Sequence, residues 1–326
     1  MTHEPRRVEW TPARVGDGAG SRLMVILAAP GCAWYARSGG CFNCSFPQSL
    51  GTGGPVSADD FAAQIEAAID RIPTATGARR PVAIDLFVSG SFFNPDEVSV
   101  EAQKRMLQRA ARVPRCARIL VESRPEYVTA DALHRAVQAA GSIPLEIAIG
   151  LESADDAIRA KKIHKGFTWR QFEQAAHLVA AAKLSLFVYV LLKPMDCTEA
   201  ESISDALETC QRVAGLGKDL GCGIRIGLEP CFVAPNTKLE QAFFEGRYRP
   251  PWLWSVVEVA QRACALAPIH VGLSDEGLQP ARAAHNCDRC SASVIEALAA
   301  FNLSQDARPL AELDCECKAE WRQALE

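Results

Sequence analysis

The sequence lacks any long hydrophobic run. Its longest nearly uninterrupted apolar stretch, residues 184–192, is far shorter than the ~20 residues that a membrane-spanning helix needs. The first sixteen residues contain arginines, but no apolar segment follows them as it does in a secretory signal. The sequence therefore predicts a cytoplasmic protein with no membrane span.

The sequence also lacks an excess of basic charge. It has 35 Lys and Arg residues against 39 Asp and Glu residues, a formal net charge of −4. No run of basic residues is longer than a pair, so we expect no extended positive surface for the phosphates of a nucleic acid or a membrane. The charge therefore favours a small-molecule substrate.

No fixed-period repeat is present, and no glycine-rich dinucleotide-binding fingerprint follows the first predicted strand. The chain has 326 residues, of which 48% are hydrophobic and 23% charged. This composition is typical of globular proteins and excludes disordered, collagen-like and coiled-coil chains. The length suffices for two domains or for one α/β barrel with an appendage.

Short apolar segments alternate with longer amphipathic ones along most of the chain. The apolar segments are rich in Val, Ile and Leu, as parallel strands buried on both faces are; they cover residues 23–29, 82–88, 118–123, 145–152, 184–192, 223–230 and, more weakly, 269–273. The amphipathic segments predict helices at residues 57–71, 97–112, 129–140, 168–182, 198–216 and 252–266. Strand-then-helix units predict right-handed crossovers in one parallel sheet. The pattern favours an α/β protein with a partial parallel (β/α)6 TIM-like barrel.

The alternation does not extend over the whole chain. We expect an N-terminal extension at residues 1–20, the barrel at residues 21–275 and a small cysteine-rich module at residues 276–326. The last of these carries four of the thirteen cysteines. Because disulfides are rare in a reducing compartment, clustered thiols of this kind usually bind metal.

Three cysteines follow the first predicted parallel strand. Cys32, Cys41 and Cys44 have the spacing C-x8-C-x2-C in PGCAWYARSGGCFNCSF. A structural zinc site needs four protein ligands, whereas three thiolates leave one iron of a [4Fe–4S] cluster open to an external ligand. The alternatives are a zinc site completed by a distant residue and a loop of unrelated cysteines.

These cysteines and four later segments resemble the radical S-adenosylmethionine (SAM) enzymes. The segments are VSGSFFNP (88–95), ILVESRPEYV (119–128), IAIGLESADDAIR with HKGFTWRQF (147–172) and LEPCFVAPNTKLE (228–240). They look most like the archaeosine synthase β-subunit type, close to the elongator catalytic-subunit branch. The spacing of the cysteines is longer than the C-x3-C-x2-C of most radical SAM enzymes.

The resemblance implies a role for each matching residue. Cys32, Cys41 and Cys44 would bind the catalytic [4Fe–4S] cluster, whose open iron chelates SAM. The residues that would bind SAM are Ser89, Gly90, Ser91, Glu122, Arg124, Glu152 and Lys165. Ser89 to Ser91 would contact the amino group of SAM, and Glu122 and Arg124 would lie near the ribose and carboxylate of SAM. Reductive cleavage of SAM would start the reaction, with an electron donor such as flavodoxin or ferredoxin.

Four cysteines stand close together in the tail: Cys287 and Cys290 in HNCDRC, and Cys315 and Cys317 in DCEC. Four thiolates close a zinc tetrahedron or hold a second [4Fe–4S] cluster, and the sequence does not choose between the two. A metal would stabilise a tail that is too short and polar to form much core.

The sequence therefore predicts a radical SAM enzyme that abstracts hydrogen from a nucleoside-like small molecule, in modified-nucleoside or natural-product biosynthesis. With an auxiliary cluster in the tail, sulfur insertion is the expected reaction. The alternative is a tRNA-base-modifying lyase of the archaeosine type, with a structural zinc in the tail and an RNA-binding partner. A rival of another class is a non-catalytic iron–sulfur or zinc subunit that docks onto an enzyme.

Overall fold

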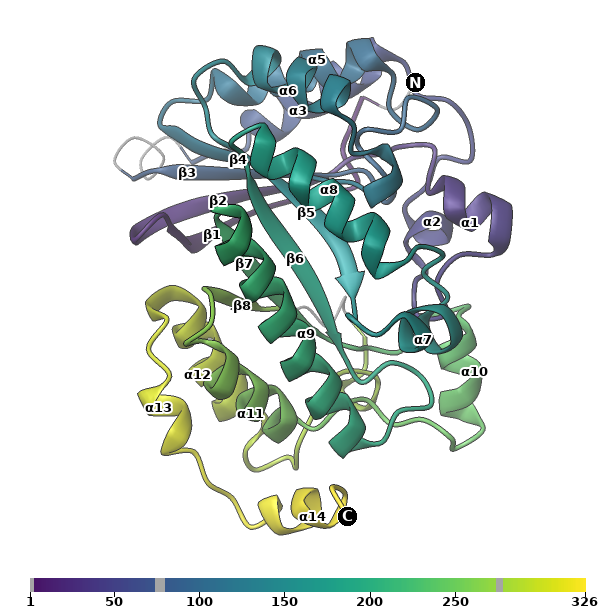
Figure 1. Ribbon diagram of the computed structural model, residues 1–326, viewed down its shortest axis with the longest axis vertical. Coiled ribbons are helices and arrows are strands. Elements are labelled where there is room, and N and C mark those ends of the chain that lie inside the picture. The colour runs from purple at the N-terminus through teal and green to yellow at the C-terminus, as the bar shows by residue number, and fades with distance from the viewer. Residues whose placement is uncertain (1–2, 74–79, 274–277) are drawn as a thin grey trace.

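A curled, open sheet organises the chain (Figure 1). The computed structural model describes residues 3–73, 80–273 and 278–326. The sheet has eight strands in the order of the sequence: β1 (Arg7–Val15), β2 (Gly18–Ile26), β3 (Val82–Phe87), β4 (Cys116–Glu122), β5 (Leu145–Glu152), β6 (Ser185–Leu192), β7 (Ile224–Pro230) and β8 (Ile269–Val271). β1 is antiparallel to β2, and every later neighbour is parallel. The expected α/β half-barrel is confirmed.

Helices follow the strands and lie around the outside of the curled sheet (Figure 1). The long ones are α3 (Ala58–Ile69), α5 (Val100–Ala111), α6 (Ala130–Ala140), α8 (Trp169–Ala181), α9 (Glu199–Leu220), α11 (Leu253–Ala263) and α12 (Ser291–Ser304). The first five begin at a Ser or Thr whose side-chain oxygen accepts a backbone N–H of the first turn, which satisfies an otherwise unpaired donor: Ser57, Ser99, Thr129, Thr168 and Thr198. Among the described residues, no helix combines the length and the apolar character that crossing a bilayer requires.

The segment expected as an N-terminal extension contains β1, which pairs with β2 along its whole length from Arg7 to Val15. The sequence analysis did not predict this strand, because its residues RVEWTPARV are partly polar and include a proline. The proposed domain boundaries stay a prediction.

The two faces of the sheet differ in character. One face carries aliphatic side chains, such as Leu23, Ile84 and Ile147, which pack under the helices as part of the main core. On the other face, near the amino ends of the strands, an ion-pair network crosses the sheet: Arg22–Asp85–Arg118–Glu146–Arg225. Polar groups are therefore concentrated inside the half-barrel, where each buried carboxylate has two guanidinium partners.

The helix α12 protects the edge strand β8. Asn302 accepts the N–H of Val271 at 2.7 Å and donates to its carbonyl at 2.8 Å, and Gln305 does the same for Ile269 at 2.9 and 2.7 Å. These two amides replace a ninth strand, because an unpaired strand edge is otherwise open to aggregation. The same helix also contacts β1, so it lies across the opening between the first and last strands.

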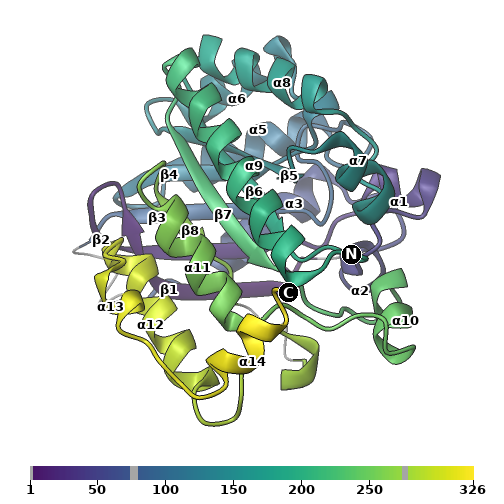
Figure 2. The same cartoon turned by 60° about the horizontal axis from the view of Figure 1, so that its bottom comes forward.

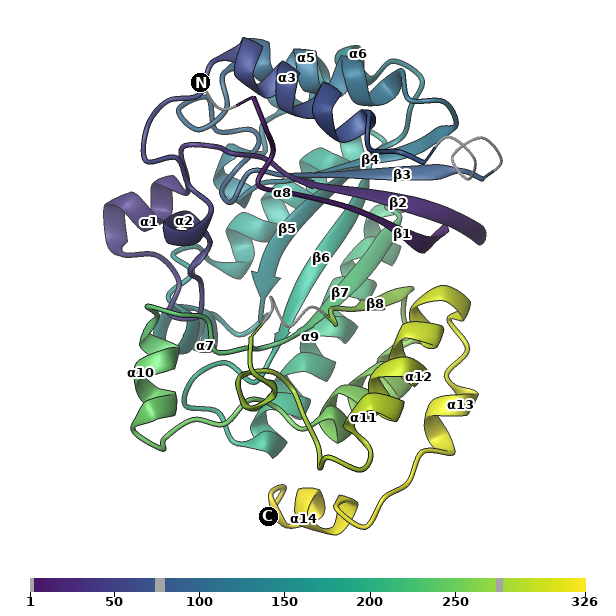
Figure 3. The same cartoon turned by 180° about the vertical axis from the view of Figure 1, so that it is seen from behind.

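The remaining short helices gather at two places. α1 (Ala33–Ser38), α2 (Phe46–Ser49), α7 (Asp156–Ile158) and α10 (Lys238–Phe244) lie together beside the carboxyl ends of the parallel strands (Figure 3). α13 (Arg308–Ala311) and α14 (Lys318–Gln323) form the C-terminal tail, and α14 lies beside α11 (Figure 2). Ligand sites of parallel α/β sheets form at the carboxyl edge, so the first group marks the place to examine.

Candidate active site

The three-cysteine loop leaves the sheet after β2. Cys32 precedes α1, and Cys41 and Cys44 lie between α1 and α2, where Cys44 N–H donates to the Cys41 carbonyl at 3.2 Å. The turn that returns from α1 uses Gly40, whose φ is +76°. A Cβ at this position would stand 2.5 Å from the Tyr35 ring, so the turn requires glycine.

The three thiols of the cysteine loop affect one another's pKa. Burial raises the pKa of Cys32 and of Cys41, and it raises that of Cys44 to about 12. Cys32 raises the pKa of Cys41, both of them raise that of Cys44, and Lys165 acts in the opposite direction on Cys41 and Cys44. Thiolates at this place therefore need a positive partner, which a bound metal cluster supplies together with Lys165.

The loop is docked on the segment after β5. The Trp34 indole N–H donates to the His164 carbonyl at 2.9 Å, and His164 Nδ1 lies 2.7 Å from the Gly40 carbonyl oxygen. The His164 ring also stacks on Phe42, with centroids 5.0 Å apart. Because both its ring and its backbone hold the cysteine loop, His164 acts as a support for that loop.

The SGS segment after β3 is joined to the cysteine loop by Glu97. The buried Glu97 carboxylate accepts the backbone N–H groups of Ala33 and Ser91 and the Asn94 amide, the first at 2.9 Å and the last at 2.8 Å. A Cβ on Gly90 would stand 2.0 Å from this carboxylate, which explains the glycine. Sequence reasoning missed Glu97; its only signal was a carboxylate shortly after the SGS segment.

Glu122 and Arg124 lie where β4 ends. Burial raises the pKa of Glu122 to about 7, and the nearby carboxylates of Glu152 and Glu97 act in the same direction. The Arg124 guanidinium lies over the rings of Trp34 and Phe167, 5.0 and 5.3 Å from their centroids. Its Nε donates to Glu126 at 2.7 Å. The β4 end therefore presents one carboxyl and one oriented cation to the site.

Glu152 and Lys165 form a partly buried ion pair, with Nζ and Oε1 2.6 Å apart. Burial by itself lowers the pKa of Lys165, but Glu152 and Cys41 more than compensate and raise it above its ordinary value. Gly150 leaves room for the pair, because a Cβ there would stand 2.6 Å from Nζ. The lysine thus stays charged beside the cysteine loop.

Two buried polar atoms around this loop have no hydrogen-bond partner among the described residues: Ser89 Oγ and Arg124 Nη2. A buried polar atom without a partner is costly, so such atoms mark a place where a ligand completes the hydrogen bonds. One hydroxyl, one guanidinium N–H and the three thiols fit a polar cofactor on an iron–sulfur cluster. Contacts and charges connect Ser91, Arg124, Glu152 and Lys165 to the cysteine loop, and their role in binding SAM stays a prediction.

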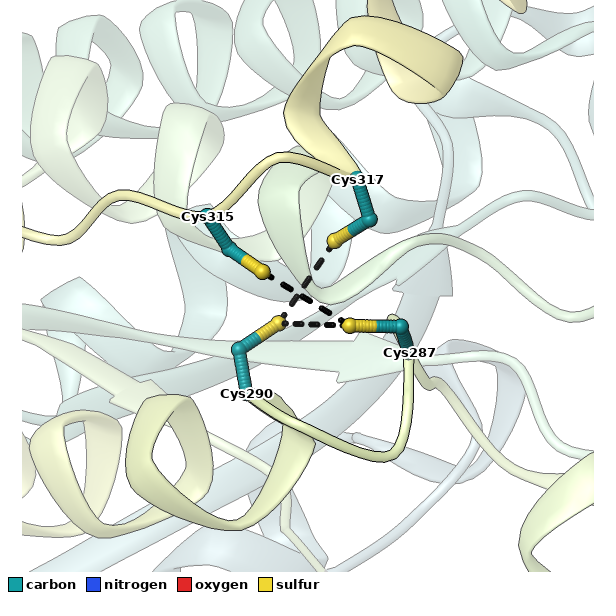
Figure 4. Close-up of side chains that lie close together, drawn as sticks. All are labelled: Cys287, Cys290, Cys315 and Cys317. Carbon is teal, nitrogen blue, oxygen red and sulfur yellow. Dashed lines mark hydrogen bonds between the residues drawn. The ribbon is translucent and has the colours of Figure 1, made fainter.

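The four tail cysteines form a separate and tighter group (Figure 4). Their sulfur–sulfur distances are 3.7 Å for Cys287–Cys290, 3.6 Å for Cys287–Cys315 and 3.6 Å for Cys290–Cys317. Among the described residues, this is the only group of three or more potential ligands whose donor atoms all lie within 4.8 Å of one another. The thiols of the cysteine loop therefore do not share this close spacing.

Comparison with known proteins agrees with this geometry. No protein-family model matches the chain. Archaeosine synthase subunit beta of Methanosarcina acetivorans is 33% identical over 330 residues, covering 100% of this chain and 91% of that protein. The protein of the same name from Thermococcus kodakarensis is 30% identical, with coverages of 97% and 96%. The solved structure of archaeal Elp3 from Methanocaldococcus infernus with an N-terminal deletion matches with a TM-score of 0.52 at 14% identity, covering 74% of this chain and 59% of that one, which shows a common fold.

The class predicted from the motifs, a radical SAM enzyme of the archaeosine synthase β-subunit type, agrees with these relatives. Within that superfamily, the chain belongs to the family of archaeosine synthase subunit beta.

Proposed function

We propose that this chain is the radical SAM subunit of an enzyme that modifies a nucleoside within tRNA. The observation that carries the proposal is similarity over essentially the whole chain to two proteins named archaeosine synthase subunit beta. This similarity favours a tRNA substrate, the alternative given by the sequence analysis, over a free nucleoside-like small molecule. With a net charge of −4, the chain is expected to bind tRNA through a partner subunit that supplies a basic surface.

In this proposal Cys32, Cys41 and Cys44 would hold a [4Fe–4S] cluster, and three thiolates would leave it able to bind SAM. The bound cluster and SAM supply reductive cleavage and hydrogen abstraction from carbon, with an external donor such as flavodoxin or ferredoxin as the source of the electron. The protein's contribution is to hold these groups and to exclude water and stray thiols from them.

Several surrounding residues would contribute to holding the cluster and SAM. Ser89 Oγ and Arg124 Nη2, which have no partner among the described residues, would bind polar groups of SAM. Glu97 keeps the cysteine loop and the SGS segment in register through backbone hydrogen bonds. Lys165 places a positive charge beside the cysteine sulfurs. The aromatic rings of Trp34 and Phe167 hold the Arg124 guanidinium in place.

The proposal is tested on tRNA from the source cells. Nucleosides of bulk tRNA are compared by mass spectrometry between the wild type, a gene deletion, and deletions complemented with the wild-type chain, with Cys44→Ala or with Cys264→Ser. Cys264 is a matched control, because it is the residue after α11 and, among the described residues, its thiol hydrogen-bonds only to the Gln261 carbonyl of that helix.

We expect one modified nucleoside to disappear in the deletion and to return with the wild-type chain and Cys264→Ser, but not with Cys44→Ala. Unchanged tRNA in every strain would refute the tRNA substrate. Purified, reconstituted protein should also release 5′-deoxyadenosine from SAM with dithionite. If a cluster-replete sample releases none, the enzyme is not a radical SAM catalyst of this kind.

A further inference from the structure

The spacing of the tail cysteines indicates how many metal atoms they hold. In a tetrahedral zinc site each sulfur lies about 2.3 Å from the metal, so neighbouring sulfurs are about 3.8 Å apart. The sulfur distances here are 3.6–3.7 Å, and all four sulfurs lie within 4.8 Å of one another. In a [4Fe–4S] cluster each cysteine binds a different iron, which places the sulfurs much further apart.

We infer that Cys287, Cys290, Cys315 and Cys317 bind a single zinc ion in a closed, four-thiolate site. The inference does not depend on the substrate proposed above. Four thiolates leave no open position on the metal, in contrast to the three-cysteine loop, and a closed site is the structural kind. Such a site holds no sulfide, so it does not supply sulfur to a substrate.

The surroundings of the tail site fit a metal–thiolate centre. The Trp254 indole N–H donates to Cys317 Sγ at 3.4 Å, and hydrogen bonds of this kind orient metal ligands. A zinc ion with four thiolates carries a net charge of about −2. The Lys318 ammonium, 5.0 Å from the Trp254 ring centroid, and the Arg289 guanidinium, paired with Glu316, are cations beside the ligands.

The metal would join α12 and α14, which pack against different parts of the protein. Cys290 is the residue before α12, the helix whose Asn302 and Gln305 protect β8, and Cys317 is the residue before α14. Figure 4 shows the two pairs of cysteines meeting from these two segments. The zinc ion therefore attaches the C-terminal segment to the helix that covers the open edge of the sheet.

α14 in turn is linked through α11 to the loop after β6. The Trp321 indole N–H donates to Ser255 Oγ at 2.8 Å, and Ser255 donates to the buried carboxylate of Glu199 at 2.6 Å. Glu199 also pairs with Lys193, the residue after β6. Through this chain of contacts the zinc site supports the loop after β6, beside the proposed active site.

The test is the metal content of the full chain after purification and anaerobic reconstitution, for the wild type, Cys315→Ser and the control Cys264→Ser. We expect about one zinc and about four irons per chain in the wild type and the control. Cys315→Ser should lose the zinc, keep the four irons and melt at a lower temperature. Activity is not needed for this readout, so failure of the tRNA proposal would leave it unaffected.

A second measurement covers the case that Cys315→Ser does not fold. The wild-type chain is expressed with cobalt, which should give the strong visible absorption of tetrahedral cobalt with four thiolates. About eight irons without zinc in the wild type, a halving of iron in Cys315→Ser, one mononuclear iron in place of zinc, or the absence of the cobalt spectrum would each overturn the inference.

Discussion

We predict that Glu97 stabilises the contact between the cysteine loop and the SGS segment. Its buried carboxylate accepts two backbone N–H groups, from Ala33 beside Cys32 and from Ser91. A buried donor left without a partner costs about 1–3 kcal/mol. Glu97→Ala removes the acceptor for both, so the free energy of unfolding should fall by about 2–6 kcal/mol. Glu97→Gln keeps the side-chain volume but replaces one acceptor atom with a donor. Its free energy of unfolding should therefore fall by roughly half as much as that of Glu97→Ala.

The assay is urea unfolding of the apo chain, followed by the iron content after reconstitution. Glu101→Gln is the matched control, because Glu101 is an exposed glutamate on α5 that forms a surface ion pair with Arg105. It should change stability by less than about 0.5 kcal/mol. We expect both Glu97 variants to bind less iron than the control. Equal urea midpoints for Glu97→Ala, Glu101→Gln and the wild type would refute the reasoning.

Three further changes test other parts of the structure. Lys165→Met leaves Glu152 partly buried without its cation and should cost about 3–5 kcal/mol in urea unfolding. His270→Gln tests an imidazole whose pKa burial lowers to about 3, helped by nearby guanidinium groups. The unfolded imidazole takes up a proton below about pH 6.5 but the folded one does not, so the wild type should lose up to about 2 kcal/mol relative to the variant between pH 7 and pH 5. Gly166→Ala places a Cβ 2.2 Å from Trp34 at a φ of +77° and should lower the iron bound after reconstitution.

Each of these has its own control and its own refuting result. Lys161→Met removes an exposed lysine of the same segment and should be nearly neutral; equal losses for the two lysine variants would contradict the ion-pair argument. Parallel stability curves for the wild type and His270→Gln from pH 7 to pH 5 would show that the imidazole is not held neutral. Gly215→Ala lies in α9 with nothing within 4 Å of the added Cβ, so iron loss there too would show a general effect of the substitution.

Much of the fold was predictable because its signals are local. Strands buried on both faces read as short Val-, Ile- and Leu-rich runs, and the strands from β2 to β8 and the long helices from α3 to α11 lie at the predicted segments to within a few residues. β1 was not predictable in this way. Its partly polar residues become a strand only because β2 offers them an edge along its whole length.

The same distinction between local sequence signals and tertiary contacts applies to the candidate site. The sequence by itself determined the cysteine loop, the motifs of the SAM residues and the four tail cysteines, since spacing and residue type are properties of short segments. Only the tertiary structure brought Glu97 to Ala33, 64 residues earlier in the chain, and placed the amides of Asn302 and Gln305 along β8. It also brought Cys287 within 3.6 Å of Cys315 and Cys290 within 3.6 Å of Cys317, because these two distances depend on how the segments before α12 and α14 pack and not on how the cysteines are spaced along the chain.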